Sequence, residues 1–221
     1  EEDREDIEYA LYARHSHVYG KPLVIEEIRN GKLAADRVEV LHKVVKDLEA
    51  VDITIWIPGR VTIGDIQRRV SALQMVKPLD FVVIDYLQLV YPETWKRDAH
   101  EAMAEIMRDC KRLARQEDIP VLALHQMSRD GNLEAEKRGH YVLQNLAASS
   151  EVEKNSDVVI WNLITLEMRE TMEMRIGVMK DRRGPILPEG YMVYTDFATG
   201  LVDERLEEPT GTAFIERFIL P

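Results

Sequence analysis

The sequence predicts an α/β fold with a mainly parallel, twisted sheet flanked by helices, and with antiparallel strands toward the C-terminus. Short apolar runs alternate with segments of helical periodicity through the first two thirds of the chain. Two of these runs, residues 81–84 and 121–124, are apolar at every position. Strands that are buried on both faces of a parallel sheet have this composition. The last apolar runs have short connections between them, which favours antiparallel pairing.

Helices are predicted where apolar residues recur with the period of an α-helix, over residues 4–19, 38–48, 63–75 and 102–115. Thr62 precedes the third of these segments and can cap its N-terminus. The fourth has the clearest apolar stripe, and Cys110 lies on it. We therefore expect Cys110 to be a small core side chain.

Strands are predicted for the apolar runs at residues 53–57, 81–84, 121–124, 158–161, 174–179 and 191–194. The stretch from 128 to 140 is polar and is assigned no strand. No internal repeat, low-complexity tract or long linker interrupts the chain. A single domain over residues 1–221 is therefore the economical interpretation.

Composition excludes several classes of protein. The 221 residues contain no apolar run of about 18, so we expect no membrane-spanning helix and no membrane partner. The single cysteine excludes a disulfide scaffold and a cysteine-built zinc site, and it fits a reducing compartment. The N-terminus has no features of a signal peptide. The net charge of −11 argues against a protein that coats itself with nucleic acid.

Polar residues follow three of the predicted strands: Asp85, the pair His125–Gln126, and Lys180. Ligands of parallel α/β sheets bind beyond the carboxyl ends of the strands. An aspartate in that position can hold a Mg²⁺-bound water next to the phosphates of a nucleotide. The same pattern of an apolar run and an aspartate also occurs in many other α/β proteins.

Residues 84–89, Ile-Asp-Tyr-Leu-Gln-Leu, resemble the second motif of the DnaB-type replicative helicases, which are RecA-like ATPases. Residues 124–129, Leu-His-Gln-Met-Ser-Arg, resemble the third motif of this family. The fourth motif is similar to residues 145–157, and the C-terminal Lys-x-Arg-x-Gly-Pro turn to residues 180–185. Residues 101–121 are similar to the family's intervening helix and strand. These landmarks follow the family's order and cover nearly the whole chain.

The resemblance implies an ATP-dependent DNA helicase motor, which couples ATP hydrolysis at subunit interfaces to translocation on single-stranded DNA and to duplex unwinding. ATP and Mg²⁺ would be its cofactors. Asp85 would bind Mg²⁺, and Gln126 would sense the γ-phosphate. Lys180 and Arg182 would reach the ATP site of a neighbouring subunit, as an arginine supplied in trans does. The alternative for this pair is a basic strand end in solvent. Glu1, or alternatively Glu2, would be the catalytic base for the attacking water.

The resemblance also implies partners: single-stranded DNA, further copies in a hexameric ring, primase and a helicase loader, in the cytoplasm at a bacterial or phage replisome. Candidate DNA contacts are Lys96 and Arg97 in one loop, Ser149 and Ser150 in another, and Arg129 at the end of the third motif. Trp95 could stack on a base or cover its loop. Residues 96–115 hold six bases and four acids, so the acidic total does not exclude local DNA binding.

Two departures from the family pattern affect the predicted site. Ala147 and Ala148 replace the usual Arg-Glu of the fourth motif, so that loop lacks a DNA-facing arginine. His125 replaces the usual serine of the third motif. A histidine there either makes the site sensitive to pH or forms hydrogen bonds within the core.

No Gly-x-x-x-x-Gly-Lys-Ser/Thr loop occurs in the sequence. We therefore expect a motor domain without its first strand, phosphate loop and first helix, which does not hydrolyse ATP efficiently by itself. A second hypothesis is a non-catalytic RecA-like module for assembly or regulation. A third, another RecA-like ATPase such as a recombinase or a KaiC-like protein, is disfavoured by Gln88.

Overall fold

The computed structural model describes residues 4–96, 98–143 and 149–204. The chain divides into two compact units. The described residues of the first unit are 4–54, 164–175 and 192–204, and the second unit contains those between 55 and 163 and from 176 to 191. Among all the described residues, no helix is long and apolar enough to cross a membrane.

The first unit contains the N-terminal helices α1 (Arg4–His15), η1 (Ser16–Tyr19), α2 (Ile25–Arg29) and α3 (Ala35–Glu49), and also α8 (Leu166–Glu170) and β8 (Leu201–Asp203). Its core is built on Leu23, Val40 and Val44. The predicted helices at 4–19 and 38–48 are confirmed. Val18, expected on the apolar side of the first helix, is exposed. The chain tightens there from α to 3₁₀ geometry, which changes the direction of each following side chain.

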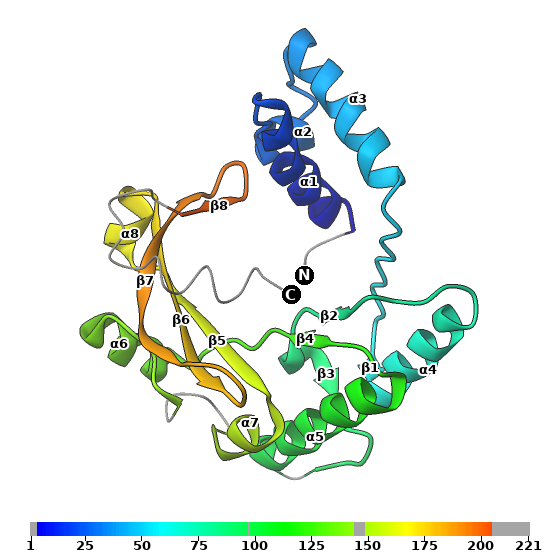
Figure 1. Ribbon diagram of the computed structural model, residues 1–221, viewed down its shortest axis with the longest axis vertical. Coiled ribbons are helices and arrows are strands. Elements are labelled where there is room, and N and C mark those ends of the chain that lie inside the picture. Colours follow the sequence, from blue (N-terminus) through cyan, green and yellow to red (C-terminus); the bar gives the residue numbers. More distant parts are fainter. Residues whose placement is uncertain (1–3, 97, 144–148, 205–221) are drawn as a thin grey trace. The chain divides into compact units, whose positions relative to one another are not determined.

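The second unit contains α4 (Ile63–Gln74), η2 (Leu87–Leu89), α5 (Ala99–Glu117), α6 (Arg129–Arg138) and α7 (Ser149–Asn155). The predicted cap of α4 is confirmed, because the Thr62 hydroxyl accepts from the Asp65 N–H and the Asp65 carboxylate accepts from the Thr62 N–H. The long helix α5 packs against α4 and α7 (Figure 1). It is therefore the element to which α4 and α7 are attached.

The described strands confirm the α/β class, with parallel pairing first and antiparallel pairing near the C-terminus (Figure 1). β1 (Val61–Thr62) pairs in parallel with β3 (Val90–Tyr91), and β2 (Val82–Ile84) with β4 (Val121–Ala123). A four-stranded sheet has the order β5 (Val158–Leu163), β6 (Glu173–Asp181), β7 (Leu187–Asp196) and β8. β7 and β8 are antiparallel.

The core of the second unit joins residues of β2, α5 and β5, among them Ile84, Leu113 and Trp161. Cys110 is buried in this core, as predicted, and burial raises the pKa of its thiol to about 12. The thiol is therefore protonated at neutral pH and is not a nucleophile. A Cβ at Gly177 would lie 2.6 Å from the Trp161 ring and from the Leu187 carbonyl oxygen, so only glycine lets the indole pack this closely.

Two expectations about local structure are wrong. Residues 53–57 form no strand, and Ile53, Trp56 and Ile57 are exposed, because strand propensity is realised only where a neighbouring strand offers hydrogen bonds. No element is predicted for the polar stretch 128–140, which contains α6, capped by Ser128. β2 and β4 are not buried on both faces, since Val83 is 49% exposed and Leu122 is 52% exposed.

Candidate functional site

Asp85 and Gln126 lie at the same edge of the β2–β4 pair. The two strands are parallel and in register from Val82 and Val121 to Ile84 and Ala123. Pairing continues past the strands, where the Leu124 N–H donates to the Ile84 carbonyl oxygen at 3.0 Å. The Asp85–Tyr86 peptide bond is cis, and the Asp85 side chain is exposed. Both predicted residues are therefore presented beyond the carboxyl ends of neighbouring strands.

Gln88 connects the two strand ends. Its side-chain Nε2 donates to the Gln126 carbonyl oxygen at 2.9 Å, and its Oε1 accepts from the Gln126 N–H at 3.3 Å. These bonds use only backbone atoms of Gln126, so its side-chain amide is not consumed by them. Sequence reasoning quoted Gln88 as part of a motif but did not assign it to the site. Its position three residues after Asp85 was the available signal.

The donor set around Asp85 suits a magnesium ion that arrives with a nucleotide. Among the described residues, no group of three or more His, Cys, Asp or Glu side chains could hold a metal ion. Mg²⁺ is commonly bound by one or two carboxylates, with phosphate and water oxygens as its remaining ligands. A single exposed carboxylate at the strand end fits this mode of binding, and it does not fit an all-protein metal cage.

His125, two residues after the end of β4, has a lowered pKa that favours its neutral form. Both ring nitrogens are buried and lack a hydrogen-bond partner among the described residues, so the alternative of a core hydrogen bond is not seen. Burial lowers the pKa of His125 and outweighs the opposing effect of the Gln126 backbone. Protonation of this imidazole therefore opposes folding.

His125 is expected to make stability fall as the pH drops below about 6.5, the value of an unperturbed histidine. The unfolded chain binds the proton first because the folded-state pKa is lowered, so stability is present above 6.5 and decreases toward and through the folded pKa. Denaturant unfolding of His125→Ser at pH 7.5 and pH 5.5 should show a weaker pH dependence than the parent protein. The exposed His100→Ser is the control, and an equal flattening there would contradict the assignment.

Lys180 and Arg182 lie together at the C-terminal end of α7. The Lys180 ammonium donates to the Ser156 carbonyl oxygen at 2.7 Å and also to that of Glu153. The Arg182 guanidinium donates to the Lys154 carbonyl oxygen. Carbonyl groups at the end of a helix have no partners within it, so the two cations supply the missing donors. Desolvation, followed by repulsion from Arg182, lowers the pKa of Lys180.

The loop before α5 is fixed by Glu105. This carboxylate accepts from the Thr94 N–H at 3.1 Å and the Thr94 hydroxyl at 2.9 Å, and it pairs with Lys96 at 2.6 Å. The positive charge of Lys96, which the sequence predicts to contact DNA, is thus paired with a carboxylate within the protein. Sequence reasoning missed Glu105, since nothing in the helical pattern marks it. Trp95 is 85% exposed and does not cover the loop.

The Glu105→Gln substitution is expected to remove an acid-sensitive part of the stability. The hydrogen bond from Lys96 is the largest cause that lowers the pKa of Glu105 to about 2. A depressed carboxyl pKa stabilises the fold above the unfolded value of about 4.5, and this stabilisation is lost as the pH falls through about 2. The slope of unfolding free energy between these pH values should therefore be smaller in the variant. Glu101→Gln, at an exposed position of α5, should keep the parent slope.

The remaining predicted site residues are placed less completely. Arg129 is exposed at the first position of α6. Ser149 and Ser150 are the first two residues of α7, and their side chains lie outside the described part of the structure. Glu1 and Arg97 are also outside the described residues.

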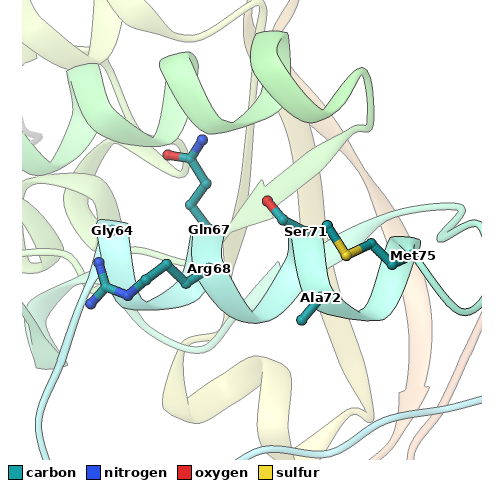
Figure 2. A pocket seen from close by; sticks show the side chains of 6 residues that line it. All are labelled: Gly64, Gln67, Arg68, Ser71, Ala72 and Met75. Carbon is teal, nitrogen blue, oxygen red and sulfur yellow. The ribbon is translucent and has the colours of Figure 1, made fainter.

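Two hollows lie in the second unit, and Lys96, a predicted DNA contact, lines one of them. One, of about 480 Å³, adjoins the loop before α5, where the Arg60 guanidinium lies 4.5 Å from the centre of the Tyr91 ring. Figure 2 shows the other, which runs along α4 and is lined by Gly64, Gln67, Arg68, Ser71, Ala72 and Met75. Gln67 and Ser71 bind Gln116 and Glu117 of α5, so these two side chains serve helix packing. None of the predicted site residues lines the hollow along α4.

The fold is that of RecA-like ATPase domains. A DnaB-like replicative helicase, solved in a study of its interactions with primase, has a TM-score of 0.79 and 19% sequence identity, over 92% of this chain and 48% of the other. A second solved structure, of an ATPase domain by itself, has the same TM-score and identity, and 72% of that chain is covered. At this level of identity the structural likeness establishes the architecture, and it confirms the predicted fold class.

The chain belongs to the DnaB-like helicase C-terminal domain family, whose model matches residues 6–197. The replicative DNA helicase DnaB of Geobacillus stearothermophilus is 27% identical over 73% of this chain and 36% of its own length. That of Helicobacter pylori is 30% identical over 62% of this chain and 28% of its own length. The chain thus spans about a third of the curated relatives that it matches. The predicted family is confirmed.

Proposed function

We propose that this chain forms most of the motor domain of an ATP-dependent replicative DNA helicase, with both compact units belonging to that one domain. The observation that carries the proposal is the β2–β4 edge, where Asp85 and Gln126 share one strand end and Gln88 connects the strands. Family membership supports the same function. The proposed cofactors are ATP and Mg²⁺.

In this proposal Asp85 would hold Mg²⁺, which, when bound, would neutralise charge on the phosphates. Gln126 would contact the γ-phosphate through its side-chain amide while Gln88 keeps its backbone in place. Lys180 and Arg182 would act on the nucleotide of a neighbouring subunit, in a ring that is hexameric as the family resemblance implies. Glu1 is proposed as the base for the attacking water.

DNA would be contacted by two segments that α5 supports. The loop before α5 supplies Lys96 and Arg97, and the start of α7 supplies Ser149 and Ser150. Arg129 would add a further phosphate contact. Backbone N–H groups bind phosphate as well as cationic side chains do, so these segments can follow a single strand without reading its sequence.

The proposed partners are single-stranded DNA, copies of the same protein, primase and a helicase loader, at a cytoplasmic bacterial or phage replisome. One solved relative was studied for its interactions with primase, which supports that partner. The relatives from Geobacillus and Helicobacter are bacterial replicative helicases, which supports the location.

The test is ATP hydrolysis and unwinding of a forked duplex by the intact oligomeric protein, with Asp85→Asn as the inactive control. ATPase activity stimulated by single-stranded DNA and abolished in the control would support the proposal. Assembly into rings without ATP hydrolysis would instead identify a non-catalytic module for assembly or regulation.

A further inference from the structure

Asp157 lies between Lys111 of α5 and Arg182, the residue that follows β6. Its Oδ1 atom is 3.4 Å from Nη1 of Arg182, and its Oδ2 atom pairs with the Lys111 ammonium. The two carboxylate oxygens thus face two different cations. Because Lys111 belongs to α5, the orientation of the carboxylate is set by a long helix packed in the core.

Arg182 is held at its backbone as well as at its side chain. The Arg182 N–H donates to the Asp157 carbonyl oxygen at 3.0 Å. One end of the guanidinium donates to the Lys154 carbonyl oxygen, and the other faces the Asp157 carboxylate. A guanidinium is a rigid planar fork, so two acceptors at its two ends define its plane. The backbone position of Arg182 and the orientation of its guanidinium are therefore both restricted.

The contact with Asp157 restricts Arg182 without trapping it. Their side chains are 59% and 41% exposed, respectively, and exposed ion pairs at such a distance are weak and screened by salt. A phosphate group with more charge and a shorter contact would compete successfully for the guanidinium. Restriction before the reaction reduces the conformational freedom that is lost when the productive contact forms.

We propose that Asp157, oriented by Lys111, is a positioning residue that sets the direction in which Arg182 is presented to the nucleotide of a neighbouring subunit. This inference rests on the proposed function, in which Arg182 acts in trans. In this role Asp157 would act through Arg182 and would not itself touch the substrate or the reacting atoms.

The test compares steady-state ATP hydrolysis by the intact oligomeric protein and its Asp157→Asn variant in the presence of single-stranded DNA. The substitution removes the charge and keeps the side-chain size. We expect kcat to fall by roughly 10- to 100-fold, the cost of a misplaced catalytic group, with KM for ATP unchanged. Asp157→Glu should recover part of the loss. Glu153→Gln removes a neighbouring charge of α7 that is not paired with Arg182, and it should keep the parent kcat.

A double substitution separates positioning from a structural role. In an Arg182→Ala background, Asp157→Asn should cause no further loss of kcat, whereas independent losses that multiply would overturn the inference. If Arg182→Ala itself is fully active, the proposed function in trans fails. If Arg182→Ala is inactive and Asp157→Asn matches the parent, only the positioning role fails. Should Asp157→Asn unfold the protein, Lys111→Gln takes its place, with a smaller loss of kcat expected and an unchanged kcat counting against the inference.

Discussion

Replacing Arg182 by alanine is expected to lower DNA-stimulated ATP hydrolysis by about 10³-fold or more, the usual contribution of an arginine supplied across a subunit interface. ATP binding should remain close to that of the parent protein, because in the proposed function Arg182 acts at the neighbouring subunit's site. Steady-state ATPase measurements and equilibrium binding of a fluorescent nucleotide would check both parts. Arg183→Ala, one residue further on and also exposed, should leave both quantities unchanged.

Mixed oligomers make this prediction sharper. In the proposed function, Asp85→Ala would damage the subunit that holds the nucleotide, and Arg182→Ala would damage the subunit that faces it. Mixing the two inactive variants recreates interfaces in which neither residue is missing, so part of the ATPase activity should return. If Arg182→Ala instead abolishes nucleotide binding in its own subunit, its role is in cis.

Replacing Leu113 by alanine is expected to lower the free energy of unfolding by about 2–5 kcal/mol, through lost apolar burial and the cavity left behind. Leu113 is 0% exposed, on the inner face of α5 within the core of the second unit. Denaturant unfolding would show a lower midpoint with the same slope, because the surface exposed on unfolding hardly changes.

The matched control is Leu166→Ala in α8. This leucine is 83% exposed, so its truncation should change the unfolding free energy by no more than about 0.5 kcal/mol. Equal effects of the two substitutions would contradict the burial of Leu113. Both variants remove the same atoms, and the comparison therefore isolates the packing around α5.

The sequence predicted correctly those elements whose determinants lie within a short stretch of the chain. The capping box at Thr62 and the apolar stripe of α5 are complete within a few residues, and both helices formed where expected. The strand predicted at residues 53–57 does not form, because a strand depends on a pairing partner that its own sequence does not specify. The prediction that both strands are buried on both faces was wrong for a similar reason, because composition alone does not say what covers each face of a sheet. Val83 and Leu122 are exposed.

The residues of the candidate site likewise fall into those that the sequence could predict and those that it could not. Asp85 and Gln126 could be found because each follows an apolar run and stands in a recognisable motif. The groups that hold the site together could not, because their contacts join distant parts of the chain. Gln88 binds Gln126 across 38 residues, and Lys111 binds Asp157 across 46. No periodicity in either segment reports such a pair.

The helix α5 carries three anchors in succession on its surface. Glu105 holds the loop that precedes the helix, Arg108 pairs with Glu151 of α7, and Lys111 pairs with Asp157 beyond the end of α7. The first and last anchors are six residues apart, roughly 9 Å along the helix axis. A rod of this length does not stretch, so both proposed DNA-contacting segments share one rigid mount. In the proposed motor, a movement of α5 would therefore displace the loop before α5 and the start of α7 together and by the same amount.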